Sequence, residues 1–306
     1  MSAQTTSGLS AEVSTYYEKV FLARAEYEYV HQEGAQKRTM PANEGKQVNF
    51  TRHTPLATAT TALTEGTNPS EVALTASTVS AALAEYGTAV KISRFLTLTS
   101  IDANNKEKIE VVGQNMGETL DEIVRNELFT GATPQIAGGK SAVSDIAASD
   151  VLSASEIRKA TRTLQANKAR AFSGSNYSWM MKTGPYPAYD LKGDDTFVNA
   201  SIYDNKADVV RNGDLGVLYG VRFYASPNQK TTASTTTVYS NFIHGSDAFG
   251  VVDLEGDKPQ LYIIPHTKVD TNNPAGRFSM VSWATSFVAK TLNSSWLIDV
   301  KTGATA

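Results

Sequence analysis

The segment that most limits how this chain can fold is rich in Thr, Ala and Ser and runs from Ala62 to Ser93, ALTEGTNPSEVALTASTVSAALAEYGTAVKIS. Small and β-branched residues alternate along it around an EGTNP turn signal, so we predict a two-stranded hairpin. With about twenty residues in each limb it would span roughly 65 Å. A compact chain of 306 residues has a radius of gyration near ~19 Å, so the hairpin should reach well beyond its own domain.

A hairpin of this kind needs a partner surface, because an isolated hairpin in water is marginally stable. Between Thr54 and Val90 the chain has no Lys or Arg and only three charges, all Glu. This pattern favours a segment that lies on another subunit. We expect its contacts to come from residues spread along both limbs: Leu63, Glu65, Gly66, Glu71, Val72, Leu74, Glu85 and Tyr86.

Composition excludes several classes of protein. Apolar residues make up 41% and charged residues 19% of the chain, which is typical of a globular protein. A net charge of −3 argues against phosphate neutralisation as a means of holding nucleic acid. The absence of Cys excludes disulfides and thiolate metal sites and fits a reducing cytoplasm. We expect no signal peptide and no membrane span.

Two helices stand out from their apolar periodicity. The first is expected from Ser10 to about Gln32, with Tyr16, Val20 and Tyr27 on one stripe. It could pack on its own core or form an arm that lies on a neighbouring subunit, and the sequence leaves both readings open. The second, residues 105–129, is the strongest helix signal, and its buried stripe is predicted to contain Ile109, Val112, Met116, Leu120 and Ile123. Another helix and several strands follow, which gives an α+β class.

A search for catalytic chemistry finds no convincing motif. The segment AGGKS at residues 137–141 resembles a phosphate-binding loop, but Pro134 stands where that motif requires Gly. The four histidines are scattered and are expected at the surface or at an interface, and the acidic pair Asp121–Glu122 is expected on a solvated face or in a helix cap. We therefore predict no catalytic residues, no cofactor and no metal site, and a structural protein that is not an enzyme.

One monomeric alternative remains at this stage, a hydrolase or a carbohydrate-binding protein. Its sugar site would be lined by tryptophans, Trp179, Trp283 and Trp296. Isolated tryptophans of this kind are more often part of a core. Glycan binding by a stable monomer would favour this alternative.

The order of the predicted elements resembles the major capsid proteins of tailed bacteriophages, whose fold is shared with encapsulins. The resemblance rests on LTEGTNPSE in the hairpin, EYGTAVKIS leading toward the long helix, and GDLGVLYGVRFYASPN farther along. It implies an N-terminal arm at residues 1–40, an extended hairpin called the E-loop at 41–92, and a peripheral domain with a spine helix at 93–148. An axial domain at 149–240 and return strands of the peripheral domain at 241–306 complete the plan.

The resemblance also implies a function and partners. Subunits would assemble into hexamers and pentamers and form an icosahedral shell around double-stranded phage DNA, in a virion assembled in the bacterial cytoplasm. Portal, separate scaffolding and decoration proteins would be partners, and no membrane would be involved. Cross-linking through an E-loop Lys is not expected, because no Lys lies between Gln47 and Val90. An encapsulin-type shell is the alternative within this fold.

Overall fold

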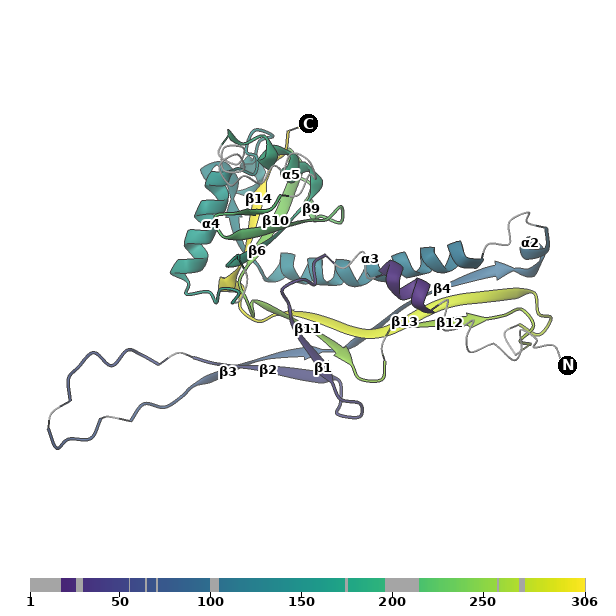
Figure 1. The fold of residues 1–306 in the computed structure, drawn as a ribbon, viewed down its shortest axis with the longest axis horizontal. Coiled ribbons are helices and arrows are strands. Elements are labelled where there is room, and N and C mark those ends of the chain that lie inside the picture. Colours follow the sequence, from purple (N-terminus) through teal and green to yellow (C-terminus); the bar gives the residue numbers. More distant parts are fainter. Residues whose placement is uncertain are drawn as a thin grey trace.

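The computed structural model describes residues 18–25, 30–54, 56–63, 65–69, 71–99, 105–173, 176–195, 215–257, 259–269 and 273–305. They form two bodies, each with its own sheet and core, and a hairpin that projects from one of them (Figure 1). The expected α+β class is confirmed.

The first body is an elongated sheet covered by one long helix. Its strands are β1 (Gln36–Met40), β11 (Phe249–Leu254), β13 (Phe278–Thr291), β12 (Gln260–Ile264) and β4 (Ala84–Ser93). β13 pairs with β4 along ten residues, from Phe278 opposite Ser93 to Phe287 opposite Ala84. α3 (Asn105–Gly131) lies along this sheet (Figure 1), and the helix and sheet together enclose the first hydrophobic core.

The long helix expected at residues 105–129 is present as α3. Ile109, Val112, Met116 and Leu120 are buried, and Ile123 is partly buried against the same core. This outcome follows from a stripe of apolar residues at helical spacing, which places one face of the helix on the sheet.

The second body is a mixed sheet of seven strands. It contains β5 (Thr133–Ile136), β14 (Leu297–Thr302), β10 (Val238–His244), β6 (Trp179–Thr183), β8 (Val221–Ala225), β7 (Val217–Leu218) and β9 (Thr231–Thr232). α4 (Ala154–Ala166) and α5 (Pro185–Lys192) pack on it and help to enclose the second core. The boundary expected at residue 240, between the axial domain and the return strands, falls inside β10. β14, near the end of the chain, also belongs to this second body.

The remaining short elements are α2 (Arg94–Thr99) and three 3-10 turns, η1 (Ala137–Gly139), η2 (Val143–Asp145) and η3 (Ser294–Trp296). The AGGKS segment therefore forms a turn after β5, with Ala137 buried, and no α-helix follows it directly as a phosphate-binding loop would require.

The hairpin is formed by β2 (Gln47–His53) and β3 (Ala76–Ala82), which pair over seven residues. Its base is held by a small third cluster of Met40, Phe50, Ala81 and Val252. The expected limbs of about twenty residues are longer than this ladder. The return limb leaves β2 at Leu83, and the following residues of the alternating run pair with β13 as β4, because β13 provides a longer pairing edge than β2 does.

Candidate assembly surfaces and the junction between the bodies

The loop that closes the hairpin has no strand pairing and is exposed along its described length, residues 54, 56–63, 65–69 and 71–75 (Figure 1). It presents large apolar side chains to solvent: Leu56 at 55%, Leu63 at 68%, Val72 at 67% and Leu74 at 61% exposure. Four large exposed apolar side chains on one loop favour an interaction site for that loop.

The contact residues expected along the hairpin fall into two places. Leu63, Glu65, Gly66, Glu71, Val72 and Leu74 are all exposed on the loop. Glu85 and Tyr86 lie instead on β4, opposite Ser286 and Thr285 of β13. Tyr86 is partly buried against the first core, so its side chain contributes to the fold of its own chain.

Two further exposed apolar groups lie at the other extremities of the molecule (Figure 1). On α2, Phe95 is 75% and Leu98 is 70% exposed. On α5, Tyr186 is 58% and Tyr189 is 73% exposed. The three groups therefore lie at three extremities of the molecule (Figure 1), which suits a subunit with several neighbours. The sequence did not predict α2, because six residues are too few to show a helical period.

The N-terminal segment packs on its own chain. Residues 18–25 are helical, with Phe21 and Ala25 buried in the first core. A Cβ on Gly113 would lie 2.7 Å from the backbone oxygen of Phe21, so glycine allows this close approach to α3. Val20 is half-buried, whereas Tyr16 and Tyr27 lie outside the described residues. The helix expected to reach Gln32 ends earlier, because residues 31–34 form a turn.

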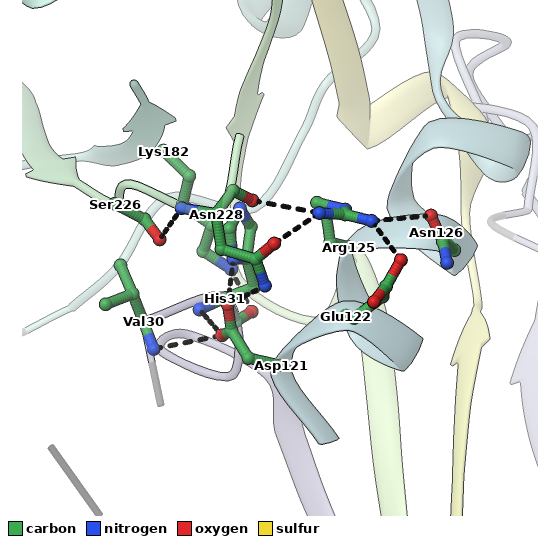
Figure 2. Close-up of polar contacts among 9 residues, drawn as sticks. All are labelled: Val30, His31, Asp121, Glu122, Arg125, Asn126, Lys182, Ser226 and Asn228. Carbon is green, nitrogen blue, oxygen red and sulfur yellow. Dashed lines mark hydrogen bonds and ion pairs between the residues drawn. The ribbon is translucent and has the colours of Figure 1, made fainter. Parts of the chain in front are cut away.

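This turn carries the N-terminal segment to a buried polar junction between the two bodies (Figure 2). Asp121 of α3 accepts hydrogen bonds from the backbone N–H groups of Val30 at 3.0 Å and His31 at 2.6 Å. Its other oxygen lies 2.7 Å from Nδ1 of His31 and accepts a bond from the Asn228 amide at 3.2 Å. Asp121 thereby ties three segments of the chain together.

Two basic side chains complete the junction. Arg125 donates to Glu122 at 2.5 Å, to Asn126 at 3.3 Å and to both oxygens of Asn228 (Figure 2). Lys182 of β6 donates to the backbone oxygen of His31 at 2.5 Å. Because α3 belongs to the first body and β6 to the second, these bonds fix one body against the other.

Burial lowers the pKa values of two basic side chains in this junction, Lys182 and His31. Desolvation lowers the pKa of Lys182 to about 7, although the negative charges of Asp121 and Glu33 oppose that shift. It also lowers the pKa of His31 despite the hydrogen bond to Asp121. The lowered pKa favours the neutral imidazole, and its Nδ1 lies within hydrogen-bond distance of the carboxylate.

The positions of these residues correct two expectations. His31 and His244 are 2% and 0% exposed, and Asp121 is 1% exposed, so none of them lies on a solvated face. No local sequence pattern predicts the junction, because His31 and Asp121 are 90 residues apart. Burial of this polar group leaves no path for a substrate to His31, Asp121 or Lys182, all at most 2% exposed, so the junction is structural.

The described part of the chain shows no metal site, no membrane-spanning helix and no sugar site lined by the three tryptophans. No group of three or more His, Cys, Asp or Glu side chains is arranged to hold a metal ion there. Among the same residues no helix has the length and apolar character needed to cross a bilayer. Trp179 and Trp283 are buried in the two cores, and only Trp296 is partly exposed, so the three tryptophans do not line a common sugar site.

No protein-family model and no curated protein matches the chain. Its fold, however, matches solved capsid structures. The cyanophage Pam1 capsid has a TM-score of 0.69 at 17% identity, covering 92% of this chain and 93% of that one. The capsid of Ralstonia phage GP4 has a TM-score of 0.67 at 15% identity, covering 89% and 88%. The capsid of a native GTA particle has a TM-score of 0.62 at 10% identity, covering 90% and 91%. This chain therefore has the major capsid fold of tailed phages.

Proposed function

We propose that this chain is the major capsid protein of a tailed bacteriophage and assembles with copies of itself into an icosahedral shell around double-stranded DNA. The observation that carries the proposal is the fold match over about nine-tenths of the chain to phage capsid chains. A fold alone does not fix a function, but the three outlying apolar surfaces add independent support, because a stable monomer has no use for them.

The shape of the subunit supports a repeated head-to-tail contact. The hairpin loop projects away from both bodies (Figure 1) and has few interactions of its own to hold it. When each copy lays this loop on the next, the same contact repeats and closes into a ring if the rotation closes. Rings of six and of five then build the shell.

We assign the centre of each ring to the second body. Its outer end carries α5 with the exposed Tyr186 and Tyr189, and tyrosine is enriched at protein interfaces because its ring is apolar and its hydroxyl is polar. The first body, with α3 and the long sheet, would form the periphery. The hairpin acts as the E-loop between neighbouring subunits, and α2 makes a further peripheral contact.

The remaining partners follow from this role. A net charge of −3 supports a shell that encloses DNA without gripping it, since a strongly basic wall would bind the phosphates. Portal and separate scaffolding proteins, and possible decoration proteins, are the expected partners. The protein would be assembled in the bacterial cytoplasm and would reside in the virion capsid, with a structural and not an enzymatic role.

The test is electron microscopy of the purified chain, alone and after co-expression with any scaffolding protein encoded near its gene, together with light scattering to measure its mass. We expect closed shells or free hexamers and pentamers. A protein that stays monomeric at every concentration under both conditions would contradict the proposal.

A further inference from the structure

A pocket of about 250 Å³ lies at the base of the hairpin, where β1, β2 and β3 meet the connection from β13 to β14. Its floor contains apolar side chains, Phe50, Val79, Leu292 and Trp296, and its polar wall includes three arginines. The pocket is smaller than typical small-molecule sites of roughly 300–1,000 Å³. Its size suits one or two protein side chains.

Two of the arginines stack on aromatic rings. The Arg38 guanidinium lies 4.6 Å from the ring centroid of Phe50, and that of Arg52 lies 4.9 Å from that of Trp296. Among the described residues neither side chain makes an ion pair. A guanidinium stacked on an aromatic ring keeps its N–H donors free at the edge for a carboxylate.

The third arginine is already neutralised. Arg170 lies 3.0 Å from the carboxylate of Asp247, and both line the pocket. The polar wall therefore has three positive charges and one negative charge, which leaves Arg38 and Arg52 to attract an anion.

An unpaired amide points to the same kind of ligand. Asn293 lines the pocket and is 8% exposed. Its Oδ1 accepts a hydrogen bond from the backbone N–H of Ser295 at 3.3 Å, but its Nδ2 has no hydrogen-bond partner in the described part of the chain. A buried donor without an acceptor is costly, and a carboxylate oxygen bound in the pocket would satisfy it.

We propose that this pocket, defined by Arg38, Arg52 and Asn293, receives Glu65 or Glu71 from the hairpin loop of a neighbouring copy. The inference rests on the proposed shell function and specifies its contact. The hairpin has no Lys or Arg between Thr54 and Val90, so its charge complements the pocket. Leu63 and Val72 lie close to these acids in the sequence and match the apolar floor.

The occupant comes from another copy because of the direction of the hairpin. The pocket is at the base of the hairpin, and the loop extends away from that base (Figure 1). A loop cannot therefore return to its own pocket. A phosphate of nucleic acid fits less well, since Asp247 on the wall would repel a polyanion and the apolar floor would remain uncovered.

The first test is a charge exchange in the full chain. We expect Arg38→Glu with Arg52→Glu, and separately Glu65→Arg with Glu71→Arg, each to lower particle yield at least about tenfold, because like charges then oppose one another. Combining all four substitutions should restore particles. The matched controls are Lys140→Glu and Asp145→Arg, both exposed on a loop of the second body, and they should assemble like the wild type.

The outcomes separate this inference from the proposed function. Wild-type particles with no loss in either double variant would overturn the pocket assignment and leave the shell function intact. Failure of the combined variant to assemble would also overturn it. If the arginine variant assembles normally but loses binding to a fluorescent DNA duplex, the pocket recognises nucleic acid and the proposal is wrong.

The second test uses the absence of Cys in the chain. Arg52→Cys is combined with Glu65→Cys or with Glu71→Cys, and assembled particles are treated with a short bismaleimide. We expect one of the two pairs to give a denaturation-resistant ladder from dimer up to hexamer. Monomer alone with both pairs would overturn the proposal. Lys140→Cys with Glu71→Cys is the control and should give no ladder.

Discussion

The imidazole Nδ1 of His31 lies 2.7 Å from Oδ2 of Asp121, although 90 residues separate the two in the chain. This contact connects the turn after the N-terminal segment to the spine helix, next to Lys182 of the other body (Figure 2). The two bodies are thus held together by a polar network, and its protonation should influence the stability of the subunit.

Asp121→Ala should lower the free energy of unfolding by about 2–5 kcal/mol, because several buried donors lose their acceptor. Urea denaturation of the unassembled subunit measures the change. Glu118→Ala is the control, since Glu118 is exposed on the same helix, and its effect should stay within about 0.5 kcal/mol. Equal effects of the two substitutions would contradict a special role for Asp121.

Lys182 should make stability depend on pH above neutrality. Its pKa is lowered from 10.5 to about 7 in the folded chain. Between these values the unfolded chain holds a proton that the folded chain has released, so the free energy of unfolding rises with pH, by at most about 1.4 kcal/mol per pH unit. Lys182→Met removes this term. Urea titrations between about pH 7.5 and 9.5 should show a steeper rise for the wild type, and parallel curves would refute the prediction.

Asp299 should make the free energy of unfolding fall as pH rises toward neutrality, which is the opposite of the effect of Lys182 above neutrality. Burial raises its pKa from 3.8 to about 7, although Lys301 and the Ser240 hydroxyl favour the charged form. Between these values the folded chain keeps a proton that the unfolded chain has lost, so stability falls as pH rises. Asp299→Asn stays neutral throughout. Its stability relative to the wild type should therefore increase from about pH 4 to 7 and then level off. A constant difference across that range in thermal melts would show that Asp299 titrates normally.

Leu120→Asp should unfold the first body, because it places a charge at a position that is 3% exposed within the first core. Circular dichroism melts should show loss of the cooperative transition. Val111→Asp is the matched control on the same helix, where the side chain is 67% exposed. A melt of Leu120→Asp close to that of the wild type would mean that this face of α3 is not core.

Replacing residues 57–73 by a short Gly-Ser turn should leave a folded subunit that builds no shells. β2 and β3 stay intact in this variant, and shortening a loop of this length changes folding stability by only about 1 kcal/mol. Thermal melts establish that the subunit is folded, and electron microscopy establishes whether particles form. Normal particles would exclude the loop as an assembly element.

The sequence predicts elements whose signal is local. The α3 stripe from Ile109 to Leu120 repeats at helical spacing, so its buried face could be named in advance. The hairpin was also predicted, but its predicted limbs of about twenty residues are longer than the ladder of seven pairs that β2 and β3 form. The alternating pattern runs without a break from β3 into β4, and only pairing with β13, about 190 residues later, separates the two strands.

Sites assembled from distant segments gave no such signal. His31, Asp121 and Lys182 come from three parts of the chain and look like ordinary surface residues when each is read in its local sequence. The pocket at the base of the hairpin is similar, since Arg38, Arg52 and Asn293 converge only after β1, β2 and the β13–β14 connection are in place. For such groups the tertiary fold decides burial, and residue type alone does not.

Within the described residues, the chain crosses between its two bodies at three places that lie against one another. Gly131, at the crossing from α3 to β5, contacts Thr291 at the end of β13. Ala248, between β10 and β11, accepts backbone hydrogen bonds from Leu292 and Asn293 at 2.9 and 3.0 Å. These crossings form one narrow waist. A pull on α5 and a pull on the hairpin loop would both pass through this waist, so in the proposed shell the waist would set how stiffly one subunit transmits force to its neighbours.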